Sequence, residues 1–353
     1  MGNELKIFWQ SFSMFCEHCA QIPQRIVNII VQALFLTGLQ PRWANASRAI
    51  MRVAMLAILP LSAAAQNDTK PAPVSASSHA KPVFAATIHP VGAILREVVG
   101  QRAEVRVLLS PASSPHTFAP TPSDVSRVQE ALALFHVDPT LDGWATRFPV
   151  EERIALFAML PVELRVPADG HVCAEHGHDQ AHQHGDQWDT HFWTDPLVVK
   201  AILPALVEEL TRLDPDGEAH YRAGADAFGA SLEALHAELT AQLISVNGRA
   251  VLLFHPSLLY LMQRYGLRLG GVVEPFPGRS PSPRQLRDLI ALMRRENIRT
   301  VYSEPQLSQR PAQALAAATG ARLAVLDPIG GVEGRMTYAE LLRFNAAVLR
   351  DTL

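Results

Sequence analysis

The feature that most constrains the fold is an alternation of short β-branched or leucine-rich runs with amphipathic helical stretches, which begins at Val83. Residues 83–88 are typical of a strand, residues 91–99 of a helix and residues 103–109 of a second strand. Two neighbouring parallel strands need a crossover connection, which is usually a helix, so this alternation indicates a mostly parallel sheet. The sequence therefore predicts an α/β fold.

The next helix is expected to begin at Thr121, because a threonine N-cap followed by Pro122 is a common start signal. Asp124 stands where the second half of a capping box belongs. We expect this helix to continue far along the chain and to carry four apolar residues, namely Val125, Val128, Leu132 and Phe135.

A much longer helix is predicted over residues 215–245. Asp214 can cap it, Pro215 fits its first turn, and its apolar residues recur at steps of three and four. These residues are Tyr221, Ala225, Phe228, Leu232, Leu235, Leu239 and Leu243. The alternation restarts after this helix, with strands at 250–255 and 266–274. We therefore predict two lobes, each with a mostly parallel sheet flanked by helices, joined by one long rigid helix.

Composition excludes several classes of function. The chain has 31 basic and 34 acidic side chains, a net charge of −3, so it lacks the basic excess of proteins that bind nucleic acid through phosphates. Three cysteines cannot form a disulfide framework. The unusual number is 14 histidines, six of which lie between His171 and His191. That clustering suggests metal binding.

The histidine-rich segment has no apolar periodicity, so we predict a mobile loop over 171–190 that offers many weak nitrogen ligands. Its histidines are His171, His176, His178, His182 and His184. The alternative is a solvated polar loop without a function.

Three candidate ligands lie where predicted strands end. His116 follows the strand at 103–109, His255 ends the strand at 250–255, and Asp327 ends a late strand. Ligands of open α/β sheets bind outside the carboxyl ends of the strands, so these side chains are expected to face one cleft. Imidazole and carboxylate groups suit a tetrahedral Zn²⁺ site. Each residue taken alone could also be an ordinary hydrogen-bonded group at a strand end.

Six segments, taken together, carry a family resemblance. They are SSPHTFAPTPSDV (113–125), WDTHFWTDP (188–196), FHPSLLYLMQRYGL (254–267), PSPRQLRDLI (281–290), SEPQLS (303–308) and VLDPIGG (325–331). In this order they resemble the cluster A-I solute-binding proteins of ABC transporters, specifically the zinc-uptake (ZnuA-type) branch. The resemblance runs from about Val83 to the C-terminus.

The resemblance implies a ligand set and a function. The metal ligands of the family fall on His116, His191, His255 and Asp327, in a cleft between two lobes bridged by a rigid long helix. The chain would be a periplasmic protein that is not an enzyme, captures Zn²⁺ and delivers it to an ABC permease for high-affinity import. It would act as a monomer, with a periplasmic zinc chaperone as a further partner and the histidine-rich loop collecting metal near the cleft.

The chain departs from the family pattern at residues 136–142, where HVDPTLD stands in place of a V-G-x-G-L-E turn. This departure puts the local turn in doubt but leaves the ligand set unchanged. We expect His136 to have a structural role. His89, at the end of the first predicted strand, is also expected not to be a ligand.

The N-terminal region reads as an export signal. Residues 51–65 combine positive charge, a short apolar core and three alanines that fit a cleavage site, so the mature chain is expected to start at Gln66 without a lipid anchor. Residues 1–50 are then an over-extended reading frame, the rival being a real N-terminal segment. The other predicted parts are a flexible linker (66–82), an N-terminal lobe (83–213), the linking helix (214–247) and a C-terminal lobe (248–353).

Three alternatives remain at this point. A Mn²⁺ or Fe²⁺ carrier of the same fold would place a carboxylate where this chain has His255, so three histidines favour zinc. A zinc hydrolase needs an open coordination position and a general base, and the sequence has no HExxH motif. A surface adhesin is a third alternative, which the missing lipid-anchor cysteine disfavours.

Overall fold

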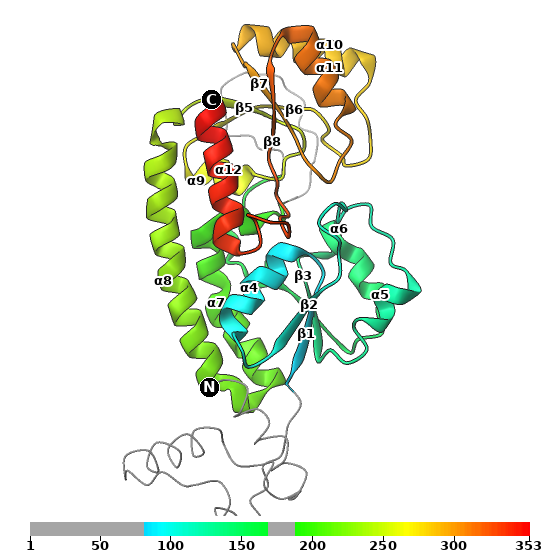
Figure 1. The fold of residues 1–353 in the computed structure, drawn as a ribbon, viewed down its shortest axis with the longest axis vertical. Helices are drawn as coiled ribbons and strands as arrows, with labels where there is room; N and C mark the ends of the chain where they lie inside the picture. The colour runs from blue at the N-terminus through cyan, green and yellow to red at the C-terminus, as the bar shows by residue number, and fades with distance from the viewer. Residues whose placement is uncertain (1–80, 169–187) are drawn as a thin grey trace, which may run out of the picture. The chain divides into compact units, whose positions relative to one another are not determined.

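The computed structural model describes residues 81–168 and 188–353, which belong to one compact unit that begins at Ser78 (Figure 1). Several predicted segments therefore lie wholly or mostly outside the described residues. These are the extension 1–50, the signal 51–65, the linker 66–82 and the histidine-rich loop 171–190.

The first sheet has four parallel strands in the order β2-β1-β3-β4. Its strands are β1 (Val83–Ala86), β2 (Glu104–Val107), β3 (Ala133–His136) and β4 (Glu152–Ala155). Phe84 on β1 pairs with Ala133 on β3, and the rings of Phe84 and Phe135 pack edge to face in the core. The mostly parallel sheet predicted for the first lobe is confirmed.

Helices α4 (His89–Val99), α5 (Pro122–Ser126) and α6 (Pro139–Asp142) connect these strands. The predicted continuation of the helix at Thr121 through Phe135 is wrong. The capping box forms, with the Thr121 amide donating to the Asp124 carboxylate at 2.9 Å, but the helix ends at Ser126. Phe135 lies instead on β3, a central strand that is buried on both faces. Apolar residues on such a strand can by chance show the spacing of a helix, and pairing within the sheet decides the structure.

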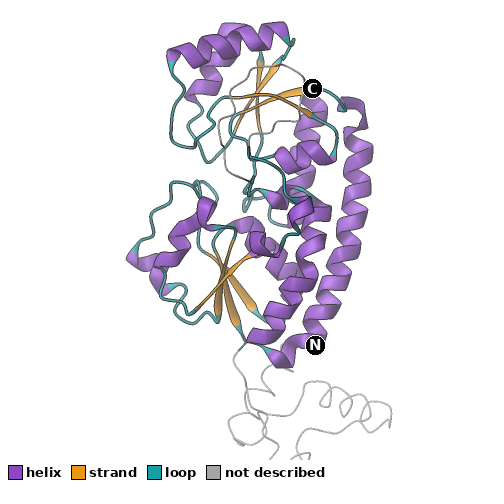
Figure 2. Cartoon of the chain, turned by 180° about the vertical axis from the view of Figure 1, so that it is seen from behind, coloured by secondary structure: helices purple, strands orange, loops and turns teal. Residues whose placement is uncertain are grey.

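The second sheet is also parallel, in the order β6-β5-β7-β8. Its strands are β5 (Ala250–Leu253), β6 (Arg268–Val272), β7 (Thr300–Ser303) and β8 (Arg322–Val325). The helices of this lobe are α9 (Leu259–Arg264), α10 (Pro283–Arg295), α11 (Arg310–Thr319) and α12 (Tyr338–Thr352). The two lobes thus repeat one architecture, and Figure 2 shows the two sheets as separate groups of strands.

Two long helices run beside the lobes, α7 (Pro196–Leu213) and α8 (Glu218–Leu243). Helix α8 packs against α7, against α4 of the first lobe and against α12 of the second (Figure 1). A side chain at Gly224 would collide with the backbone carbonyl of Val98, so glycine allows the close approach of α8 to α4. In the described part of the chain, none of the helices combines the length and the hydropathy that a bilayer span requires.

Candidate metal centre

Three histidines reach one point from three separate parts of the chain. His116 lies in the loop after β2, His255 lies two residues beyond β5, and His191 precedes the short 3-10 turn Phe192–Thr194 at the start of α7. Two of these positions are at the carboxyl ends of parallel strands, where the topology of an open α/β sheet places ligands.

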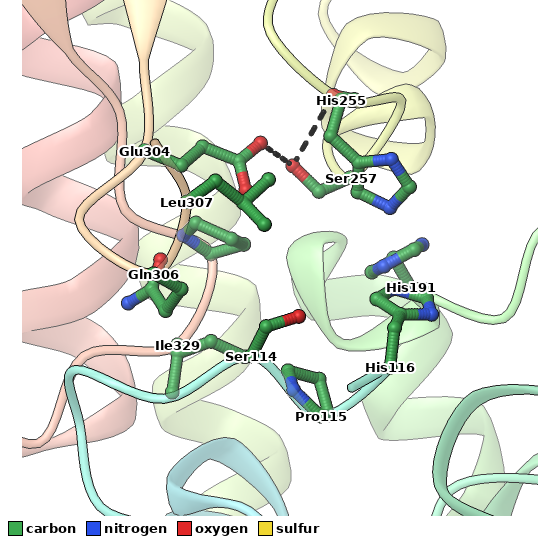
Figure 3. Close-up of a pocket in the computed structure, with 11 residues that line it drawn as sticks. Ser114, Pro115, His116, His191, His255, Ser257, Glu304, Gln306, Leu307 and Ile329 are labelled. Atoms are coloured by element: carbon green, nitrogen blue, oxygen red, sulfur yellow. Dashed lines mark hydrogen bonds between the residues drawn. The ribbon is translucent and has the colours of Figure 1, made fainter. Parts of the chain in front are cut away.

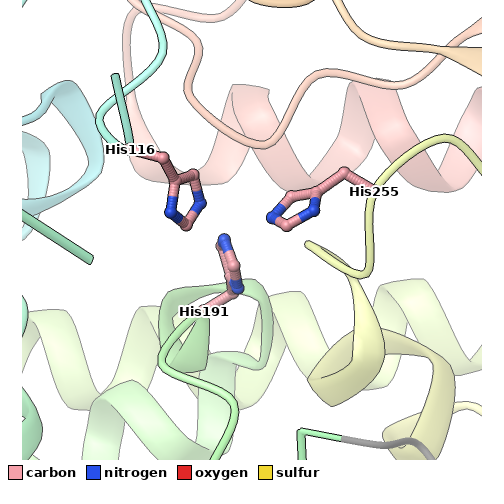
Figure 4. A group of neighbouring side chains, drawn as sticks. All are labelled: His116, His191 and His255. Carbon is pink, nitrogen blue, oxygen red and sulfur yellow. The ribbon is translucent and has the colours of Figure 1, made fainter. Parts of the chain in front are cut away.

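The three imidazole rings face one another (Figure 4). One ring nitrogen from each of His116, His191 and His255 lies within 4.8 Å of the others, and the ring centroids are 4.9 to 5.6 Å apart. Nitrogens that share a tetrahedral zinc ion at a Zn–N distance of about 2.1 Å are themselves about 3.4 Å apart. A modest contraction of this group therefore produces the geometry of a zinc site.

The cluster contains buried nitrogens that lack a partner. Within the described residues, Nε2 of His116 and both ring nitrogens of His255 have no hydrogen-bond partner. Burial lowers the pKa of His116 to about 3 and the pKa of His255 well below its ordinary value, with nearby imidazoles adding to both effects. These two rings are therefore neutral near pH 7, and each has a free lone pair for a cation.

Asp189 orients the third ring. Its Oδ1 accepts hydrogen bonds from Nδ1 of His191 at 2.6 Å and from the His191 backbone amide at 3.1 Å. When Nδ1 donates, the lone pair of the ring is on Nε2, the nitrogen left for a metal. Sequence reasoning missed this role, although the D-x-H spacing in WDTH was the signal for it.

Replacing Asp189 by asparagine is expected to weaken zinc binding by about 10- to 100-fold, because the neutral amide holds the ring less firmly in the orientation that leaves Nε2 for the metal. The measurement is a competitive titration against a chelating dye. Asp138→Asn is the matched control, since Asp138 caps α6 and lies outside the histidine cluster. If the folded Asp189→Asn variant bound zinc as tightly as the parent, the contact between Asp189 and His191 would not contribute to zinc affinity.

Hydrogen bonds from buried aromatic side chains hold the backbone of the segments that carry the histidines. The indole of Trp144 donates to the carbonyl of Pro115, next to His116, at 2.8 Å. The indole of Trp193 donates to the carbonyl of Pro328 at 2.8 Å, and the Tyr260 hydroxyl donates to the carbonyl of Asp189 at 3.1 Å. The last two bonds connect the His191 segment to the second lobe and fix the backbone on either side of that ring.

A pocket surrounds the cluster (Figure 3). It is lined by Ser114, Pro115, His116, His191, His255, Ser257, Glu304, Gln306, Leu307, Pro328 and Ile329. Glu304, immediately after β7, is a buried carboxyl that accepts a hydrogen bond from the Ser257 hydroxyl at 2.6 Å. Burial raises the pKa of Glu304 to about 8. Sequence reasoning missed this residue, although the SEPQLS motif places it at a strand end.

The fourth predicted ligand, Asp327, lies outside the group of three histidines. It follows β8, and the next two residues, Pro328 and Ile329, line the pocket. Its Oδ2 forms an ion pair with Nη1 of Arg335 at 3.0 Å. Its Oδ1 accepts hydrogen bonds from Gln306 and from the amides of Ile329 and Gly330. The structure therefore brings together three of the four predicted ligands.

His89 and His136 also lie outside the cluster. A ring nitrogen of His89 is 2.9 Å from the carbonyl of Met336. Nδ1 of His136 lies 3.4 Å from Oδ1 of Asp142, whose other oxygen accepts hydrogen bonds from Thr87 and from a backbone amide. The segment that departs from the family pattern thus forms α6 around a buried carboxylate.

Comparison with known proteins gives consistent results. A family model described as "Zinc-uptake complex component A periplasmic" (ZnuA) matches residues 84–352. The "High-affinity zinc uptake system protein ZnuA" of Brucella abortus is 25% identical over 309 residues, covering 76% of this chain and 90% of that protein.

Solved structures agree with these matches. A crystal structure of ZnuA is 26% identical, with a TM-score of 0.64, and covers 77% of this chain and 99% of that one. A mutant structure of the laminin-binding adhesin of Streptococcus agalactiae is also 26% identical, with a TM-score of 0.65, and covers 78% and 100%. Both share the architecture of two parallel-sheet lobes with flanking helices described above.

Proposed function

This chain belongs to the ZnuA family of periplasmic zinc-uptake proteins, and we propose that it captures one Zn²⁺ ion with His116, His191 and His255. The observation that carries this proposal is the convergence of three imidazoles, two of them with buried nitrogens that lack partners. Burying polar atoms without hydrogen bonds costs free energy, and a bound cation would recover that cost. Nitrogen ligands in a tetrahedral arrangement suit zinc well.

We propose Asp327 as the fourth ligand. Its position after β8 puts its carboxylate next to the pocket residues Pro328 and Ile329. In the described structure Oδ2 of this carboxylate is paired with Arg335, so a metal that binds Oδ2 would meet the guanidinium there.

Transport rather than catalysis is the role that the family supports, since its members are substrate-binding components of zinc uptake. We propose that the chain is not an enzyme, because three histidines and a carboxylate would fill a tetrahedral shell. A hydrolytic zinc site keeps a position open for water.

The finer features of the biology are also proposals. ZnuA-type proteins work with an ABC permease, and we propose that this chain delivers Zn²⁺ to such a permease as a monomer, with a zinc chaperone as a further partner. The word "periplasmic" in the family description supports export, for which we propose residues 51–65 as the cleaved signal. The histidine-rich loop is proposed to collect metal near the site.

Metal analysis tests the function directly. Protein purified without chelator should contain one zinc per chain that is retained through dialysis at neutral pH. A chain that loses all metal under these conditions, and that rebinds none in a titration, would not be a zinc-capture protein.

A further inference from the structure

The loop between β8 and α12 carries an ion pair beside the proposed site. Nη1 of Arg335 lies 3.0 Å from Oδ2 of Asp327, with the arginine side chain 20% exposed and the aspartate 2% exposed. The guanidinium also stacks on the ring of Phe344, 4.3 Å from its centroid. Arg335 is therefore held over the carboxylate from the side of the second lobe.

The backbone of this loop is fixed in the same place. The Arg335 amide donates to the Val332 carbonyl, and the Arg335 carbonyl accepts from the Gly331 amide, both at 2.9 Å. Gly331 has a φ of +80°, and a side chain there would lie 3.0 Å from the His89 ring. A turn that needs glycine and packs against the first lobe thus sets the position of Arg335.

The two oxygens of Asp327 are not equivalent. Oδ1 accepts three hydrogen bonds, from Nε2 of Gln306 at 2.9 Å and from the amides of Ile329 and Gly330 at 3.0 Å. Oδ2 faces Arg335. Binding of a metal at Oδ1 would break these three hydrogen bonds, so Oδ2 is the oxygen open to a metal, and a cation that binds there meets the positive charge of Arg335.

We infer that Arg335 sets the zinc affinity of this chain by competing with the cation for the Asp327 carboxylate. The inference rests on the proposed function and extends it to a residue that is itself not a ligand. With Arg335 present, the buried carboxylate is already neutralised before the metal arrives. Without it, the carboxylate keeps its three hydrogen bonds but is a buried charge with no cationic partner, a costly state that an incoming divalent cation relieves.

The test is a set of four proteins: the parent, Arg335→Gln, Asp327→Asn and the double variant. We expect Arg335→Gln to bind zinc about tenfold more tightly or better in a chelator competition at fixed pH and salt. In the Asp327→Asn background, the same substitution should change the affinity by less than about threefold, because no carboxylate remains to compete for.

Two further readouts separate competition from a structural effect. The apo form of Arg335→Gln should melt at a lower temperature than the parent and gain more stability on adding zinc. Cobalt(II) loaded into Arg335→Gln should show altered visible absorption bands, and the double variant should lack that change. Arg264→Gln is the matched control, since it breaks a similar pair with buried Asp195 at 2.7 Å, and its zinc affinity should equal the parent's.

A folded Arg335→Gln variant with parental or weaker affinity would overturn the inference, as would equal gains in both backgrounds. If Arg335→Gln does not fold, Arg335→Met serves instead, because methionine keeps an unbranched apolar stem beside the Phe344 ring and removes the positive charge. It should bind zinc more tightly than the parent, and an unchanged affinity would also overturn the inference. A different result would contradict the proposed function itself, namely tight zinc binding by His255→Ala both with arginine and with glutamine at position 335.

Discussion

Replacing His255 by alanine should weaken zinc binding by about two to three orders of magnitude. Binding free energies of structural zinc sites are about 10–16 kcal/mol, so an equal share for each of four proposed ligands is about 2.5–4 kcal/mol. His255 is 6% exposed, and neither of its ring nitrogens has another partner among the described residues. The substitution therefore removes a proposed ligand without breaking a hydrogen bond of that side chain.

The measurement is a competitive titration of folded protein, with His116→Ala and His191→Ala expected to behave similarly. His236→Ala is the matched control, because His236 is on α8, 3.4 Å from the Tyr265 hydroxyl and outside the cluster. It should bind zinc like the parent. If His255→Ala stayed within tenfold of the parent, His255 would not be a ligand.

Zinc should be preferred over manganese by at least about a hundredfold. Nitrogen-rich sites follow the affinity order of the first-row divalent metals, in which Mn²⁺ is the weakest, whereas Mn²⁺ favours carboxylate-rich sites. Three imidazoles meet at this site, and burial lowers the pKa values of His116 and His255, which keeps these two rings neutral. The preference therefore follows from the chemistry of the ligands.

Titration of both metals against the same chelator measures this ratio. His255→Glu should reduce the ratio of zinc affinity to manganese affinity, because a carboxylate at this position adds an oxygen ligand of the kind that Mn²⁺ prefers. Comparable affinities of the parent for the two metals would favour the manganese carrier over the zinc carrier.

Much of the fold was predictable, because local patterns and tertiary packing agree. The long helix was visible in the apolar spacing from Tyr221 to Leu243, and the structure has α8 at Glu218–Leu243. The alternation of strands and helices led directly to parallel sheets. The prediction was wrong at Phe135, which was assigned to a helix from the spacing of apolar residues but lies on the central strand β3. That outcome depends on pairing with β1 and β4, which are distant in sequence.

The site was predictable to the extent that topology determines it. His116 and His255 were found because they follow strands, and strand ends converge. The roles of Asp189 and Arg335 depend on side-chain contacts, which no spacing rule supplies. Arg335 follows Asp327 by eight residues, and glycines in the intervening turn bring its guanidinium back to the carboxylate. The D-P-x-G motif thus does not reveal the contact between Asp327 and Arg335 on which the proposed competition rests.

The most direct test of the zinc site is anomalous X-ray diffraction at the zinc absorption edge, using crystals of protein loaded with one equivalent of Zn²⁺. We expect a single strong peak about 2.1 Å from one ring nitrogen each of His116, His191 and His255. A peak at another position, or none among these three rings in fully loaded protein, would contradict the account.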